Sequence, residues 1–86
     1  MLKINNVAVL GAGVMGAQIA AHCANAGLKV FAFDITQDIA EAGIDKAVSI
    51  KPKAFYDKKD VSLIQCCNYD DHLKKLKECD WIIEVI

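Results

Sequence analysis

The chain has 86 residues, of which 55% are hydrophobic and 24% charged, a balance typical of a globular domain and not of a disordered one. Ten basic and eleven acidic side chains leave a formal net charge of −1. Nucleic acids and anionic membranes attract clustered positive charge, so we expect neither as a main partner. No apolar run approaches the roughly 20 residues of a transmembrane helix, and the first six residues lack the long apolar core and cleavage site of a signal peptide. These observations predict a cytoplasmic protein, or one inside another reducing compartment.

Strands and helices alternate through the first half of the chain. The apolar run 7–10, with Ile4 ahead of it, predicts a strand buried on both faces. Small and apolar residues then recur every three to four positions over 14–26, which predicts a helix that packs closely and is capped by Gly27. The run 29–34 predicts a second buried strand, which ends on Asp34.

The second half continues the alternation. Thr36 is a candidate N-cap for a helix with an apolar stripe from Ile39 to Val48, which should end before Pro52. A polar, lysine-rich loop is expected over 51–60, followed by a third strand over 61–66. Asn68 or Asp70 is expected to cap a short helix that reaches residue 77, and the run 81–86 predicts a fourth strand.

This alternation favours right-handed crossovers and a parallel sheet. The chain stops inside its most hydrophobic strand, so we expect the first part of a longer domain, with a substrate-binding or C-terminal domain absent. A strand without its next neighbour leaves an open edge. We therefore expect self-association through that edge or the adjacent apolar face, and a homo-oligomer.

Cysteines and histidines do not form a ligand pattern in this sequence. No two of the four cysteines have the spacing of a zinc knuckle, and the two histidines do not supply it. We expect free, partly buried thiols, no metal site, and non-catalytic histidines. These residues are Cys23, Cys66, Cys67, Cys79, His22 and His72.

Residues 11–16 form the pattern G-x-G-x-x-G between the first strand and the first helix. In this context Gly11 allows a tight turn, Gly13 lets the backbone approach a pyrophosphate, and Gly16 lets the helix pack against the strand. Free N–H groups at the start of the helix favour the negative charge of the phosphates. The pattern predicts a Rossmann-type fold: an α/β doubly wound parallel sheet, truncated after about four strands.

Asp34 follows Gly11 by 23 residues, at the end of the second strand. A carboxylate there accepts hydrogen bonds from the ribose hydroxyls of NAD and repels the 2′-phosphate of NADP. The chain has no arginine that would favour NADP. An FAD-binding variant of the fold, an ordinary strand-end acid at Asp34, and a glycine turn without any ligand remain as alternatives.

The fourth strand should lie beside the first, with its end at the ligand crevice. Glu84 is then near the cofactor or beneath it, either in a structural role or in direct contact, because a buried carboxylate needs a partner. Trp81 is expected to pack beside the sheet. The predicted cofactor-binding residues are Gly11, Ala12, Gly13, Val14, Met15, Gly16, Asp34, Ile35, Val85 and Ile86.

Three segments together resemble the NAD-binding domain of the 3-hydroxyacyl-CoA dehydrogenases, and most closely its bacterial fatty-acid-degrading members. The segments are 7–20, 33–35 and 80–86. The more specific marks are the methionine before the third glycine and the fourth-strand pattern of an aspartate, three hydrophobic residues, a glutamate and two hydrophobic residues. The resemblance covers the whole chain but only about the first half of that family's cofactor domain.

The resemblance implies that Met15 lies along NAD, that Asp34 binds the adenosine ribose, and that residues 85–86 pass the nicotinamide. The family oxidises 3-hydroxyacyl-CoA to 3-oxoacyl-CoA in fatty acid β-oxidation, using a His–Glu pair with nearby Ser and Asn. None of these catalytic positions falls within 1–86, so this chain alone is expected to be inactive. Many relatives carry a longer helical excursion between Asp34 and Val61, which weakens the case for acyl-CoA contacts from 51–60 here.

Two alternative functions remain at this point. One is a stand-alone NAD-binding or NAD-sensing module without catalysis. The other is a related hydroxyacid dehydrogenase of the 3-hydroxyisobutyrate type. That type favours leucine between the first two glycines, where this chain has Ala12.

Overall fold

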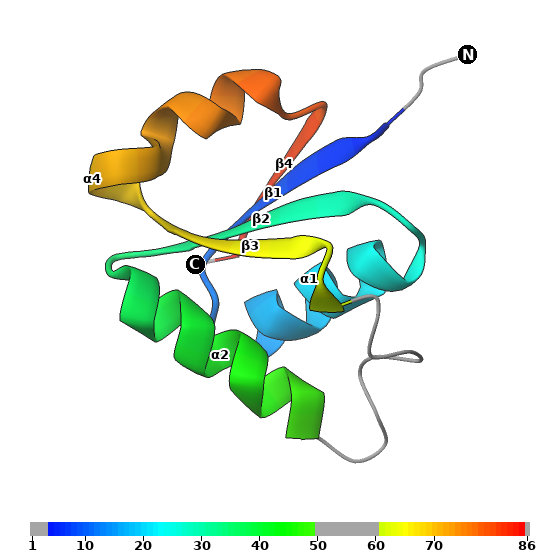
Figure 1. Cartoon of the computed structure of the whole chain (residues 1–86), viewed down its shortest axis with the longest axis vertical. Helices are drawn as coiled ribbons and strands as arrows, with labels where there is room; N and C mark the ends of the chain where they lie inside the picture. Colours follow the sequence, from blue (N-terminus) through cyan, green and yellow to red (C-terminus); the bar gives the residue numbers. More distant parts are fainter. Residues whose placement is uncertain (1–3, 50–60, 86) are drawn as a thin grey trace.

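The computed structural model describes residues 4–49 and 61–85, and within them helices cover both faces of one parallel sheet (Figure 1). Four strands pair in the order β3-β2-β1-β4 in this part of the chain. They are β1 (Asn6–Leu10), β2 (Lys29–Asp34), β3 (Ile64–Asn68) and β4 (Trp81–Glu84). The helices are α1 (Val14–Asn25), α2 (Gln37–Ser49), α4 (Tyr69–His72) and the 3-10 helix η1 (Leu73–Glu78). The prediction of a doubly wound, Rossmann-type parallel sheet is confirmed.

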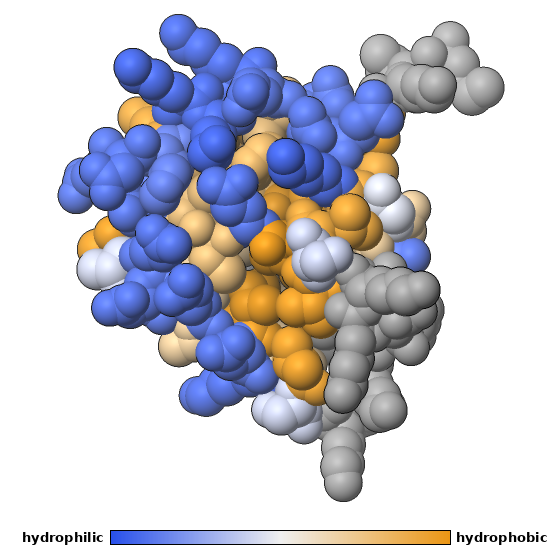
Figure 2. Space-filling view, in the orientation of Figure 1, coloured by the Kyte–Doolittle hydropathy of each residue, from blue (hydrophilic) through white to orange (hydrophobic). Residues whose placement is uncertain are grey.

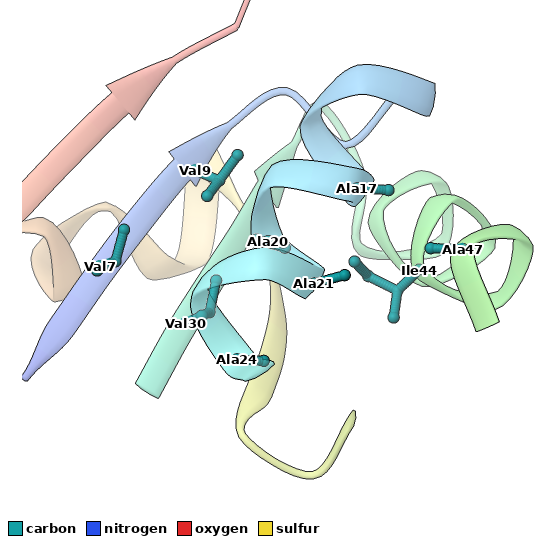
Figure 3. Close-up of a cluster of buried hydrophobic side chains, with 10 residues drawn as sticks. Val7, Val9, Ala17, Ala20, Ala21, Ala24, Val30, Ile44 and Ala47 are labelled. Carbon is teal, nitrogen blue, oxygen red and sulfur yellow. The ribbon is translucent and has the colours of Figure 1, made fainter. Parts of the chain in front are cut away.

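The two central strands are buried on both faces. Val7 and Val9 of β1 point toward α1 and α2, where they meet Val30 of β2 (Figure 3). The alternate side chains, including Ala8 and Phe33, belong to a second cluster beneath α4 and η1. Because β1 and β2 have neighbours on both edges and both faces, they form the rigid centre on which the candidate site is built.

Helix α1 lies close to the sheet because its buried face is made of alanines. Figure 3 shows the run from Ala17 to Ala24 above the β1–β2 pair, and these alanines are at most 2% exposed. The helix ends at Asn25, and Gly27 follows with φ +87°, a conformation suited to the glycine that the sequence predicts there. The hydroxyl of Thr36 accepts from the amide of Ile39 at 3.1 Å, which confirms Thr36 as the cap of α2.

The third strand begins three residues later than predicted. Val61 is helical and residues 62–63 form a turn, and β3 begins at Ile64, where pairing with β2 sets its position: Val30 lies opposite Ile64. Val61 and Leu63 therefore pack against the core from outside the sheet, whereas Ile64 and Cys66 pack against it from β3. Asn68, and not Asp70, caps α4, because its side chain accepts from the amide of Asp71.

The fourth strand pairs with β1, as predicted, but it is not a buried strand. Trp81 is 50% exposed and Ile82 is 47% exposed, because among the described residues β4 has a partner on one edge alone. The strand also ends at Glu84, earlier than predicted. Ile86, the lysine-rich stretch 51–60 and Pro52 lie outside the described residues, so the predictions made for them are untested.

The four cysteines are free thiols. Cys66 and Cys67 face opposite sides of the sheet, as adjacent strand residues must, and belong to different clusters. Burial, assisted by the negative charges of Glu41 and Asp45, raises the pKa of the Cys66 thiol to about 11.

Surface character follows the same layering. Figure 2 shows hydrophilic side chains over the outer surfaces of the α4–η1 and α2 layers, with hydrophobic side chains gathered between them. In the two described stretches of the chain, we find no helix whose length and apolarity would let it cross a bilayer.

Candidate functional site

The loop between β1 and α1 begins with a tight turn at Gly11. Its φ is +108°, and a Cβ atom at this position would stand 2.5 Å from the carbonyl oxygen of Val85. The Gly11 amide donates to the carbonyl of Phe33 at 2.9 Å, which ties the loop to β2. Any other residue here would be strained in its backbone and would clash with the end of β4.

Two further glycines bring helices against the carbonyl groups of this loop. A Cβ atom on Gly16 of α1 would overlap the carbonyl oxygen of Gly11, and a Cβ atom on Gly43 of α2 would overlap that of Ala12. The sequence pattern predicts the close packing at Gly16. It does not predict Gly43, which reads from the sequence as an ordinary member of a helical stripe; a glycine inside an amphipathic helix was the available signal.

Asp34 holds the loop from the end of β2. Its Oδ2 accepts from the amide of Ala12 at 3.0 Å, and its Oδ1 accepts from the amide of Ile35 at 2.7 Å. The half-buried carboxylate therefore uses both oxygens to bind backbone N–H groups. Sequence reasoning places Asp34 at the site but misses its contact with the loop, because that contact depends on the tertiary path of the glycine turn.

Beyond Ala12 the loop opens to solvent. Within the part of the chain that the structure describes, a Cβ atom on Gly13 would meet nothing within 4 Å, and Gly13 has φ −67°, which any residue adopts. Val14 and Met15 are 64% and 67% exposed, and the N-cap residue of α1 is Gly13, which has no side chain to cap the helix. Neither packing nor backbone conformation therefore requires a glycine at position 13, and the exposed first-turn amides suit an anion.

A groove of about 500 Å³ extends from this opening, between the start of α1 and the length of α2. Small and apolar residues make up most of its lining, and Lys46 supplies a positive charge. Gly13 and Val14 line one end, and Ile39 and Ala42 are among the lining residues from α2. The open corner at Gly13 is thus continuous with a concave surface.

The carboxyl ends of the strands bring an aromatic residue near Asp34. The ring of Tyr69 stacks on Phe33, with ring centroids 5.7 Å apart. Burial raises the pKa of the Tyr69 hydroxyl, and the negative charges of Asp34 and Glu84 raise it further. Tyr69 was absent from the predicted site. The third strand was predicted to end at residue 66, whereas β3 ends at Asn68, so Tyr69 directly follows the carboxyl end of the strand.

Glu84 lies at the carboxyl end of β4, where it pairs in register with Leu10. Its side chain is exposed and needs no buried partner, so the prediction of a buried carboxylate at Glu84 is wrong. Val85 reaches the site through its backbone: its amide donates to the carbonyl of Leu10 at 2.9 Å, and its carbonyl lies beside Gly11. Ile35 is 71% exposed next to Asp34.

The histidines lie away from the loop. His22 is exposed in the last turn of α1, and His72 accepts from the amide of Asn68 at 3.0 Å. Among residues 4–49 and 61–85, no group of three or more His, Cys, Asp or Glu side chains is arranged to hold a metal ion.

Comparison with known proteins gives concordant matches. Residues 6–86 match the family model of the 3-hydroxyacyl-CoA dehydrogenase NAD-binding domain. A probable 3-hydroxyacyl-CoA dehydrogenase of Deinococcus radiodurans is 46% identical over 92 aligned residues, covering 99% of this chain and 27% of the relative. One of Bacillus subtilis is 38% identical, covering 96% and 13%. The chain thus spans about a quarter or less of the length of these relatives.

Solved structures give the same picture. A diketoreductase superposes with a TM-score of 0.75 at 32% identity, covering the whole of this chain and 33% of the other. A 3-hydroxybutyryl-CoA dehydrogenase from Escherichia coli superposes with a TM-score of 0.75 at 26% identity, covering 96% and 19%.

Proposed function

Because this chain belongs to the family of 3-hydroxyacyl-CoA dehydrogenase NAD-binding domains, we propose that it binds NAD at the loop between β1 and α1. The observation that carries the proposal is the bare, open corner at Gly13, where no atom of the described residues fills the space that a side chain would take. A diphosphate would rest there on the exposed amides of the first helical turn. The groove beside this corner would accommodate a molecule larger than the diphosphate alone.

Each predicted site residue has a proposed role in that binding. Residues 11–16 would carry the diphosphate, and Asp34 and Ile35 would face the adenosine ribose. Val85 and Ile86 would lie on the nicotinamide side. Bound NAD supplies the hydride acceptor, and the residues of this chain bind and orient it. The carboxylate of Asp34 would repel a 2′-phosphate, so NAD is proposed as the cofactor and NADP is not.

We further propose that the longer protein oxidises 3-hydroxyacyl-CoA to 3-oxoacyl-CoA in the β-oxidation of fatty acids. The names of the relatives support this assignment. Residues 1–86 would be the N-terminal part of the cofactor domain, with the catalytic groups on residues that this chain does not include. A cytoplasmic location and a homo-oligomer belong to the same proposal.

A titration with NAD and with NADP, followed by amide chemical shifts of the labelled chain, tests the binding proposal. NAD should shift the amides of residues 11–16 and 34–35 in a saturable way, and NADP should bind more weakly. A chain whose loop amides do not respond to NAD, or which prefers NADP, would contradict the proposal.

Turnover separates the two levels of the proposal. The longer protein should form NADH from NAD and 3-hydroxyacyl-CoA, whereas the 86-residue chain should bind NAD without turnover. Full-rate NADH production by the chain alone would show that its catalytic groups lie within residues 1–86.

A further inference from the structure

Ala12 is the residue on which the geometry of the open corner depends. It precedes Gly13 directly and is 1% exposed, whereas Gly13 is open to solvent. Any displacement of the Ala12 peptide is therefore passed on to the amides next to it. What holds Ala12 in place decides where the corner lies.

The amide side of Ala12 is fixed by Asp34. Oδ2 of this carboxylate accepts from the Ala12 amide at 3.0 Å, and the bond from Ile35 to Oδ1 fixes the orientation of the carboxylate. A hydrogen bond to an ionised acceptor is stronger than one between neutral groups. Asp34 itself ends β2, whose preceding residues are buried in the sheet. The amide is thus attached to the rigid centre of the fold.

The carbonyl side of Ala12 is fixed by α2 through Gly43. A Cβ atom on Gly43 would overlap the Ala12 carbonyl oxygen, and it would lie 3.0 Å from the Ala12 carbonyl carbon and 3.3 Å from its Cβ atom. The overlapping atoms are backbone, so no side-chain rotation relieves the clash. Helix α2 is itself anchored in the core cluster by the buried side chains of Ile44 and Ala47, so it cannot simply withdraw.

Local preference does not explain Gly43. A glycine inside a helix costs about 1 kcal/mol relative to alanine, and Gly43 lies in the middle of α2 without a positive φ. The approach of the Ala12 carbonyl is the feature that requires it. The groove lining also places Gly43 and Ala12 together, beside Gly13.

We propose that Gly43 is a positioning residue for the dinucleotide: together with Asp34 it holds the Ala12 peptide from both sides and so sets the position of the open corner at Gly13. This inference rests on the proposed NAD-binding function and extends it to a helix that the glycine pattern does not include. Gly43 would act through the loop and would not touch the diphosphate itself.

The test compares Gly43→Ala with Ala40→Gly in the 86-residue chain. Ala40→Gly is the matched control because it weakens α2 from a buried position but adds no atom near Ala12. Gly43→Ala should weaken NAD binding about tenfold, which is the loss expected when roughly one hydrogen bond from a displaced amide to a charged phosphate is weakened. It should also shift the Ala12 and Gly13 amide resonances in the NAD-free chain. Ala40→Gly should lower the thermal midpoint with little change in NAD affinity or in the Ala12 and Gly13 amide resonances.

The outcomes separate this inference from the proposed function. If the unchanged chain does not bind NAD, the proposed function fails, and the NAD-free resonances still decide whether Gly43 positions the loop. If the unchanged chain binds NAD and Gly43→Ala binds it equally well with undisturbed Ala12 and Gly13 resonances, the inference is overturned. The same holds if Ala40→Gly weakens binding as much as Gly43→Ala.

A second variant covers the case in which Gly43→Ala does not fold. Asp34→Ala removes the carboxylate that accepts from the Ala12 amide, so hydrogen exchange of that amide in the NAD-free chain should accelerate. Exchange at the unbonded rate in the unchanged chain, or no acceleration in the variant, would show that the Ala12 peptide is not held in this way.

Discussion

The strands β1 and β4 are paired neighbours that end beside the same loop, yet they are held very differently. Val7, Ala8 and Val9 of β1 are fully buried, whereas Trp81 and Ile82 of β4 are about half exposed. The loop that follows β1 is gripped by β2, α1 and α2. The end of β4 contributes the backbone of Val85 to the same place. One wall of the candidate site is therefore part of the core, and the other is an edge.

This difference shows which contacts fix each side of the candidate site. The diphosphate corner is fixed by contacts within the segment from β1 to α2, which is continuous in sequence. The side formed by β4 depends on pairing between residues about 75 positions apart, such as Leu10 and Glu84. Changes in the first region should therefore alter both stability and binding, and changes in the second should alter stability little.

The largest effect should come from truncating the core between the two layers. Phe33 is fully buried in β2 and stacks on Tyr69, so Phe33→Ala should cost about 3–5 kcal/mol in the free energy of unfolding. The matched change on the edge, Ile82→Ala, should cost less than about 1 kcal/mol. Urea denaturation measures both values. Equal costs would mean that the two strands do not differ as described.

A smaller loss should follow from adding one methyl group at the start of α1. Gly16→Ala would place a Cβ atom on the carbonyl oxygen of Gly11, and such overpacking costs about 1–3 kcal/mol. The comparison is with Gly27→Ala, where the added atom would meet nothing within 4 Å and the strain is that of φ +87° alone. If Gly16→Ala unfolds at the same denaturant concentration as the unchanged chain, α1 does not approach the Gly11 carbonyl as closely as described.

A loss of stability at acid pH should arise from Asp80, just before β4. Hydrogen bonds from the amides of Asn5 and Asn6 hold the pKa of the Asp80 carboxyl below its usual value of 3.8. The stabilisation is therefore present above the usual value and is lost as the pH falls through the lower folded-state pKa. Thermal midpoints measured across this acid range should fall less steeply for Asp80→Asn than for the unchanged chain. If the thermal midpoints of the two proteins fell in parallel with pH, Asp80 would be excluded as the source of the acid loss of stability.

The smallest effect concerns the open edge. Trp81 is half exposed on β4, which has no partner on its outer side among the described residues. Self-association through this edge remains a prediction, and Trp81→Lys should reduce it because charged side chains oppose edge pairing. Light scattering over a range of concentrations measures the mass. A monomer at high concentration in the unchanged chain would contradict the prediction.

The fold was predictable where local signals and burial agree. The runs 7–10 and 29–34 are apolar throughout because β1 and β2 are covered on both faces, and the structure confirms both strands nearly to the residue. The third strand gave a weaker signal. Val61 and Leu63 are hydrophobic because they pack on the core from the segment before β3, so the sequence alone did not distinguish them from strand residues.

The candidate site was predictable in its members but not in its connections. The glycine pattern and the acid at position 34 are local signals with a known spacing. The grip on Ala12, the packing of Gly43 and the placement of Tyr69 arise from elements that meet only after folding. Glu84 was misjudged for the same reason, since its exposure depends on how much of the sheet lies beyond β4.

Binding of NAD by Gly13→Val tests the central claim most directly. The extended backbone of Gly13 accepts valine, and a Cβ atom there would meet no atom of residues 4–49 or 61–85 within 4 Å, so the variant should keep its fold and nearly its thermal midpoint. Its side chain would fill the corner proposed for the diphosphate, and the amide shifts that NAD induces in residues 11–16 should disappear. A folded Gly13→Val chain that binds NAD as the unchanged chain does would contradict the account.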